Sequence, residues 1–163
     1  MQLSVSNQYP EERLHLLKIE LPKAPKAVSN YEPIVQTGNL IMTSGQLPWI
    51  EGRLMYEGQL GHGGELTDEQ GYSSCRLSAL NAIAQLKEHL GDLNRVKRIV
   101  RIVGVLNVNP MSRWTEQPKV LDGASDIIND VFGERGRHSR MISSNSCMPL
   151  DCTSLIYLYA EVE

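Results

Sequence analysis

The stretch from Gly136 to Cys147 brings basic side chains to the start of a segment typical of a β-strand. Its sequence, GRHSRMISSNSC, places Arg140 where the chain becomes a run of small polar and apolar residues. A guanidinium group presents a rigid fork of donors that matches a carboxylate, which is how proteins commonly bind small organic acids. The alternative is a structural ion pair with Glu134, Asp130 or a neighbouring subunit, and the residue types alone leave both interpretations open.

Other reactive side chains give weaker indications. We expect Arg137 and His138 to face solvent or an interface rather than to bind a ligand. Ser44 lies at a predicted strand end within TSGQ, but it lacks the G-x-S-x-G turn of many serine hydrolases and an assignable His/Asp pair. The GHGGE segment, residues 61–65, lacks the Lys-Ser/Thr that follows a phosphate-binding loop, so we interpret it as a flexible loop.

Metal and cofactor chemistry have no matching pattern in the sequence. The histidines are His15, His62, His89 and His138, and the cysteines are Cys75, Cys147 and Cys152. None of them shows metal-ligand spacing, and the cysteines form no C-x-x-C motif. We therefore predict no metal site and no cofactor, with reduced thiols as in a cytoplasmic protein.

Composition limits the kinds of partner. The chain has 163 residues and a net charge of −3, and its lysines and arginines are spread along it rather than clustered, so a nucleic-acid partner is not expected. No segment approaches the ~20 apolar residues of a membrane span. The first 17 residues lack the basic and apolar regions of a signal peptide. We expect a cytoplasmic protein that does not bind membranes.

The elements that must position Arg140 follow from hydrophobic periodicity. We interpret residues 1–163 as a single domain, with an N-terminal helix and connector over 1–27 and a core over 28–163. The predicted helices cover about 10–19, 67–91 and 118–133, and the predicted strands include two joined by a turn at 37–39 and others near 98–109, 139–147 and 154–162. The core order is therefore β-β-α-β-α-β-β, which is an α+β arrangement.

The last predicted strand has two apolar faces. Alternation places Leu155, Tyr157 and Tyr159 on the face opposite Ile156 and Leu158. If two helices cover one face, no remaining segment is available for the other, and an apolar face usually packs against something. We infer a partner subunit.

Four segments together resemble the RidA/YjgF family, the reactive-intermediate deaminases also described as endoribonuclease L-PSP-like proteins. They are NYEPIVQTGNLIMTSGQLP, GDLNRVKRIVRIVGVLNVNP, GASDIINDVFGERGRHSR and MPLD, and the resemblance covers about residues 28–163, closest to a longer-chain branch. It implies a chorismate-mutase-like fold, in which a mixed sheet carries two helices on one face. It also implies a homotrimer.

The resemblance further implies a binding site in clefts between subunits. Arg140 would hold the carboxylate of a small imino or keto acid, and Tyr31, Ser44 and Gly45 match positions that line the cleft. We also count Ile142 among the substrate-binding residues, and a backbone carbonyl near it is a candidate to place the attacking water. Active family members hydrolyse 2-imino or enamine acids to 2-keto acids and ammonia, without a cofactor.

One position departs from the family. Counted from Pro149, the glutamate that helps to place the attacking water falls on Leu155. Two hypotheses follow: a deaminase that uses Arg140 with a water held by Asp151 or by the carbonyl near Ile142, or a non-catalytic carboxylate binder. A ribonuclease has less support, because the sequence contains no paired His/Lys arrangement or basic groove.

Overall fold

The computed structural model describes residues 9–163, so residues 1–8 of the predicted 1–27 segment lie outside the described part. The helices are α1 (Pro10–Leu16), α2 (Asp68–Leu90) and α3 (Gln117–Phe132). The strands are β1 (Ile34–Thr37), β2 (Leu40–Thr43), β3 (Trp49–Ile50), β4 (Arg53–Leu54), β5 (Val96–Asn107), β6 (Ser139–Asn145) and β7 (Ser154–Val162). The predicted order of core elements is confirmed, with an added β3-β4 hairpin, and α1 ends three residues earlier than its predicted end at about residue 19.

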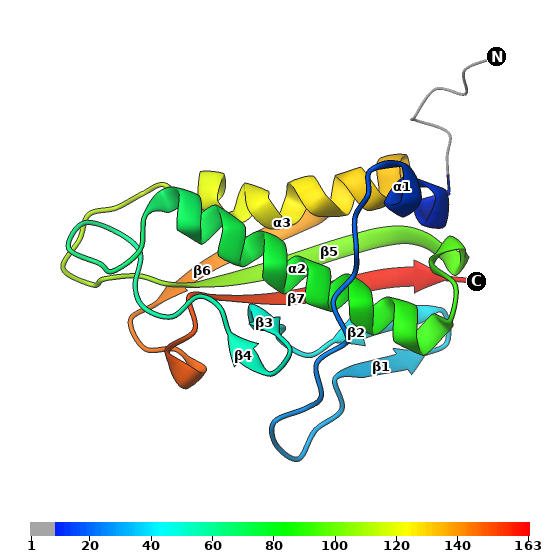
Figure 1. Ribbon diagram of the computed structural model, residues 1–163, viewed down its shortest axis with the longest axis horizontal. Coiled ribbons are helices and arrows are strands. Elements are labelled where there is room, and N and C mark those ends of the chain that lie inside the picture. Colours follow the sequence, from blue (N-terminus) through cyan, green and yellow to red (C-terminus); the bar gives the residue numbers. More distant parts are fainter. Residues whose placement is uncertain (1–8) are drawn as a thin grey trace.

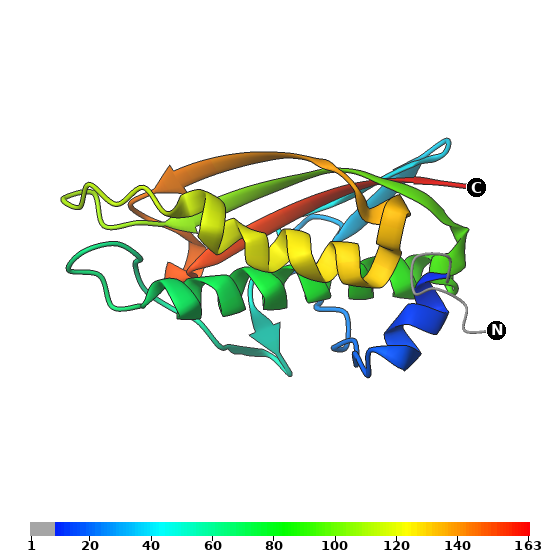
Figure 2. The ribbon, with the colours of Figure 1, turned by 90° about the horizontal axis from the view of Figure 1, so that it is seen from above.

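Five strands form one mixed sheet in the order β1-β2-β7-β5-β6. β5 and β6 run parallel, whereas the other neighbouring strands run antiparallel. α2 and α3 lie side by side on one face of this sheet, and α1 packs against α3 (Figure 1, Figure 2). The α+β class and the two helices on one face are therefore confirmed.

Local sequence signals determine where α2 begins and ends. The Gln70 backbone N–H donates to Thr67 Oγ1 over 3.2 Å, and the Thr67 backbone N–H donates to Gln70 Oε1 over 2.9 Å. This capping box satisfies two amide groups that the first turn leaves without helical partners. At the other end, Gly91 has a φ of 76°, which glycine adopts without a steric penalty, and its N–H donates to Lys87 O.

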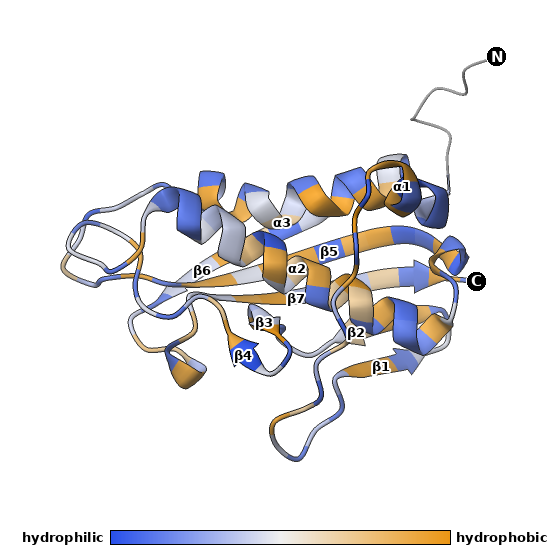
Figure 3. Cartoon of the chain, in the orientation of Figure 1, coloured by the Kyte–Doolittle hydropathy of each residue, from blue (hydrophilic) through white to orange (hydrophobic). Residues whose placement is uncertain are grey.

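The two long helices approach closely at Gly123. A Cβ atom added to this residue would lie 2.0 Å from the backbone oxygen of Tyr72 in α2. α3 carries both polar and apolar residues along its length (Figure 3). Its apolar residues recur at helical spacing, and those such as Leu121 and Ile128 are fully buried. Gly123 therefore allows α3 to seat its apolar side deep against α2 and the sheet.

The opposite face of the sheet is covered only in part by the described residues. Leu155 is 7% exposed and packs in a small cluster with Leu47, Met148 and Cys152, so the prediction that its own chain cannot cover it was wrong. Tyr159 on the same face is only partly buried, and other apolar residues that remain exposed are Val35, Val100 and Met141. The satellite cluster forms where the turn between β6 and β7 folds back, a contact that strand periodicity does not predict.

Replacing Gly123 with alanine should lower the free energy of unfolding by about 3 kcal/mol, the upper part of the range for overpacked interiors. The new methyl group would collide with a backbone oxygen that cannot move without displacing α2. Urea denaturation followed by circular dichroism measures the effect. Asn129→Ala, on the exposed side of the same helix, is the control and should change stability by less than about 0.5 kcal/mol. Equal stabilities of the two variants would contradict the close approach.

Candidate functional site

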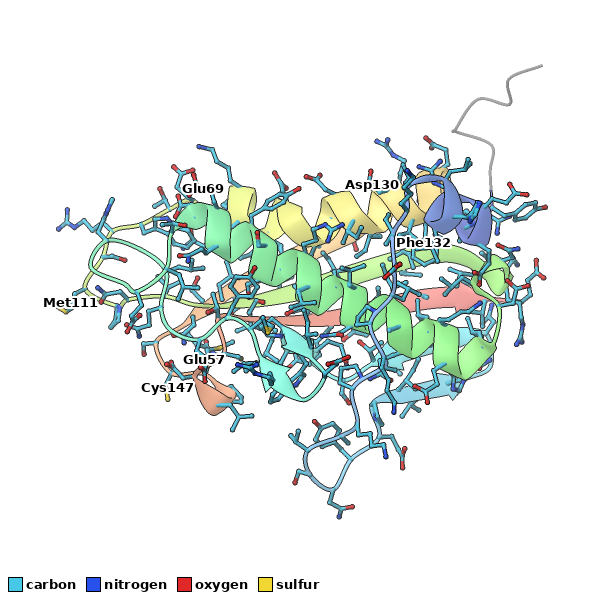
Figure 4. All side chains as sticks on the ribbon, in the orientation of Figure 1. Glu57, Glu69, Met111, Asp130, Phe132 and Cys147 are labelled. Atoms are coloured by element: carbon cyan, nitrogen blue, oxygen red, sulfur yellow. The ribbon has the colours of Figure 1, made fainter. Side chains whose placement is uncertain are left out.

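Arg140 is held against α3 by three acceptors. Its Nη1 donates to Asp122 Oδ1 over 2.7 Å and to Ser125 Oγ over 3.1 Å, and its Nη2 donates to Pro118 O over 3.1 Å. The ion-pair partner is thus Asp122, and the predicted alternatives Glu134 and Asp130 were wrong. Asp130 lies about two turns further along α3, near its C-terminal end (Figure 4).

The Arg140–Asp122 pair is open to solvent. The side chains are 26% and 48% exposed, respectively. An exposed ion pair contributes only about 0–1 kcal/mol to stability, since water screens it. Asp122 therefore orients the guanidinium but leaves it accessible to solvent. A ligand carboxylate could compete with Asp122 for the same donors.

A serine and a histidine extend this network beyond Arg140. Ser125 Oγ lies 2.9 Å from His138 Nε2, and His138 Nδ1 lies 2.5 Å from Gly136 O. A carbonyl oxygen can only accept, so Nδ1 carries the ring proton in the neutral histidine and Nε2 accepts from the Ser125 hydroxyl. Ser125 Oγ in turn accepts from Arg140.

The surroundings of His138 favour its neutral form. Burial lowers the pKa of this histidine below its usual value, and the Arg140 charge lowers the pKa further, against a raising effect of the hydrogen bond to Gly136. His138 is partly buried, with one ring nitrogen against Ser125 of α3, and it also lines an open hollow, so the expectation that it faces solvent or an interface stays a prediction. The sequence contains a signal for the contact between His138 and Ser125. Ser125 is a polar residue in the apolar helical stripe that includes Ala124 and Ile128, and a buried hydroxyl needs a hydrogen-bond partner.

Tyr31, Ser44 and Gly45 gather at the end of β2. Ser44 Oγ donates to Glu32 O over 2.6 Å, and Tyr31 and Gly45 line the same water-sized hollow. Gly45 also faces an aromatic ring, because a Cβ atom there would lie 2.9 Å from the Tyr157 ring. The structure therefore brings these three predicted site residues together, beside Tyr157.

Amide side chains on α2 hold the Ser44 segment in place. Asn81 Nδ2 donates to Leu47 O over 2.9 Å. Gln85 Nε2 lies 3.2 Å from Gln46 Oε1, and Gln46 Nε2 donates to Ser44 O over 3.0 Å. Sequence analysis did not identify these buried amides, which lie in the middle of α2 and serve a segment more than 30 positions away.

The predicted site residues form two separate groups within one chain. Arg140 and Ile142 lie on β6, at one edge of the sheet, whereas Ser44 and Gly45 follow β2 near the other edge. β7 and β5 lie between them, so three strand spacings of ~4.8 Å, or roughly 14 Å, separate β2 from β6. One chain does not bring the two groups into contact.

Acidic side chains near the family glutamate position are not free to replace it. Leu155 itself is enclosed by apolar side chains. Asp151 Oδ1 accepts from Asn107 Nδ2 over 3.0 Å.

The described residues contain no group of three or more His, Cys, Asp or Glu side chains arranged to hold a metal ion. Among residues 9–163, every helix is too short or too polar to span a membrane.

Comparison with known proteins places this arrangement in a family. Residues 11–162 match the family described as "YjgF/chorismate_mutase-like, putative endoribonuclease", and the chain belongs to it. A "putative endoribonuclease" from Shewanella oneidensis MR-1 is 51% identical, with a TM-score of 0.89 over 95% of this chain and 100% of that one.

Two further relatives have no stated activity. The protein Atu1372 from Agrobacterium tumefaciens is 33% identical, with a TM-score of 0.84 over 94% of this chain and 92% of that one. Protein TCP17 from Trypanosoma cruzi is 42% identical over 128 residues, which are 78% of each chain. These likenesses establish the RidA/YjgF family and its fold.

The lowered pKa of His138 predicts a pH-dependent stability. Between that pKa and ~6.5, the value in an unfolded chain, the unfolded state binds more protons than the folded state, so the free energy of unfolding falls as pH falls through this window. His138→Gln should remove this component, which urea denaturation at several pH values between 5 and 8 would measure. The two proteins should have parallel stability curves above that window. An unchanged slope of the variant within that window would contradict the assignment.

Proposed function

We propose that the chain forms a RidA/YjgF-type homotrimer that binds small carboxylate metabolites, such as imino or keto acids, in clefts between subunits. The observation that carries the proposal is the separation of the two residue groups near opposite edges of one sheet. A neighbouring copy could supply the Tyr31, Ser44 and Gly45 group to the Arg140 and Ile142 group. A site that is incomplete within one chain gives a reason for assembly.

The uncovered sheet face supports the same assembly. Met141 is 50% exposed and Val100 is 41% exposed, and the partly buried Tyr157 and Tyr159 lie between them and β2. Clustered apolar side chains of this kind on a soluble surface usually mark an interface. β1 and β6 each have one edge without a strand partner among the described residues, and such edges are commonly protected by association.

Arg140 is suited to bind a carboxylate because α3 orients it beforehand. Three acceptors fix the guanidinium plane, so little side-chain entropy remains to be lost on binding. A ligand carboxylate could replace Asp122 at Nη1 or use the donors that Asp122 leaves. Asp122 then acts as an internal competitor for the ligand.

The proposed reaction is hydrolysis of a 2-imino or enamine acid to a 2-keto acid and ammonia. Leu155 can neither accept a proton nor hydrogen-bond a water, and a well-placed general base contributes ~10²–10⁴-fold to such reactions. Its apolar surroundings favour, as the alternative, a non-catalytic trimer that only binds carboxylates. A ribonuclease, which the Shewanella protein's description suggests, has less support because the net charge is −3.

Light scattering after size-exclusion chromatography should give three times the 18.3 kDa mass of one chain. Tyr157→Asp should reduce the trimer fraction, since it places an unpaired charge on the proposed interface. Met111→Asp is the matched control, because Met111 is 88% exposed at the tip of a distant loop (Figure 4). A monomeric wild-type protein would overturn both the assembly and the cleft between subunits.

Arg140→Ala should weaken binding of pyruvate or 2-ketobutyrate ten- to hundredfold in calorimetry, because a charge-assisted hydrogen bond contributes ~1.5–3 kcal/mol. Arg140→Lys should restore little, since an ammonium group cannot make the two-pronged contact. Asp122→Asn should tighten binding several-fold by removing the competing carboxylate. Wild-type affinity in Arg140→Ala would assign Arg140 a structural role only.

A further inference from the structure

A continuous hydrogen-bond chain runs from the Arg140 guanidinium through the Ser125 hydroxyl to the His138 imidazole and ends at Gly136 O. We propose that Ser125 and His138 form a proton relay that serves the reacting centre beside Arg140, in place of the carboxylate that Leu155 lacks. This inference rests on the proposed function, because the relay needs a substrate anchored at Arg140.

The direction of each hydrogen bond matches that role. Gly136 O fixes the ring proton on Nδ1, so Nε2 is the accepting nitrogen. The Ser125 hydroxyl donates to Nε2 and accepts from Arg140 through one lone pair, which leaves its second lone pair for a water proton. A serine that served packing alone would not need a donor, Arg140, on one side and an acceptor, His138 Nε2, on the other.

The reaction balances without any further reagent. The water oxygen bonds to the imine carbon and the C=N π pair moves to nitrogen. One water proton passes to Ser125 Oγ while the serine proton passes to His138 Nε2. The imidazolium then returns this proton through the same path to the amine nitrogen. When the C–N bond breaks, the remaining hydroxyl proton leaves with ammonia, so the keto acid forms and both side chains regain their starting state.

Ser125 is better placed as a relay than as a nucleophile. It is 9% exposed and lies in the interior of α3, where the backbone N–H groups are used by the helix and cannot form an oxyanion hole. His138 also lines an open hollow of about 510 Å³ together with Arg137 and Arg98, which gives the proton a route to solvent.

The charges around His138 favour a neutral base at neutral pH. On its own segment the Arg140 charge disfavours the imidazolium, and the neighbouring Arg137 is exposed. Asp122, the carboxylate of this network on α3, is paired with Arg140. Arg98 and Glu161, from β5 and β7, line the same hollow with opposite charges. The lowered pKa of His138 agrees with this balance.

The test measures keto-acid release from freshly generated 2-iminopropionate by the full-length protein between pH 5 and 8. Wild type should lose turnover at acidic pH as His138 becomes protonated. His138→Gln retains an acceptor for Ser125 but cannot take up a proton, so kcat should fall ~10²–10⁴-fold and become independent of pH in this range. Ser125→Ala should show a similar fall in kcat. His138→Gln leaves the three hydrogen bonds of Arg140 in place, so it should bind pyruvate within about threefold of wild type, a margin well below a tenfold affinity change.

The outcomes separate this inference from the proposed function. Pyruvate binding with wild-type turnover in His138→Gln would overturn the relay and leave the deaminase standing. Pyruvate binding without turnover in wild type would overturn the relay and favour the non-catalytic binder. A wild-type protein that neither binds pyruvate nor releases keto acid would overturn the relay and the proposed function together. If the variants do not fold, nitrogen NMR of wild type still decides, because the His138 titration midpoint must coincide with the acidic limb of turnover.

Discussion

The close approach of α2 and α3 at Gly123 is the contact on which the rest of the site depends. It sets how deeply α3 lies against the sheet, and Asp122 precedes Gly123 while Ser125 follows it by two positions. A larger residue there would lift α3 and carry both side chains away from Arg140. A packing constraint between two helices therefore determines the orientation of a guanidinium group on a neighbouring strand.

Each long helix holds one half of the candidate site. α2 fixes the Ser44 segment through the amides of Asn81 and Gln85, and α3 fixes Arg140 through Asp122 and Ser125. Because the helices lie on one face of the sheet, the other face keeps its apolar side chains available (Figure 2). The same architecture thus positions two half-sites and leaves a surface through which copies of the chain could join them.

The elements could be predicted from the sequence because their signals are local. The capping box of α2, the apolar stripe of α3 and the turn at Gly38 are each specified within a few residues. Long-range pairings could not be predicted in the same way. Periodicity shows which face of α3 is buried, but it does not show how far α3 is shifted along the direction of β6. That shift decides whether Arg140 contacts Asp122 or Asp130. The cover over Leu155 likewise depends on how a turn folds back.

The energetics of the Arg140 network favour a role in binding over a role in stability. An exposed ion pair contributes about 0–1 kcal/mol, too little for Asp122 and Arg140 to matter much to folding. A neutral imidazole beside Arg140 has a further consequence. A carboxylate base would add a second negative charge next to the substrate carboxylate and would compete for the same guanidinium, as Asp122 already does. A relay that ends in His138 adds no such charge, so Arg140 keeps more of its attraction for the substrate.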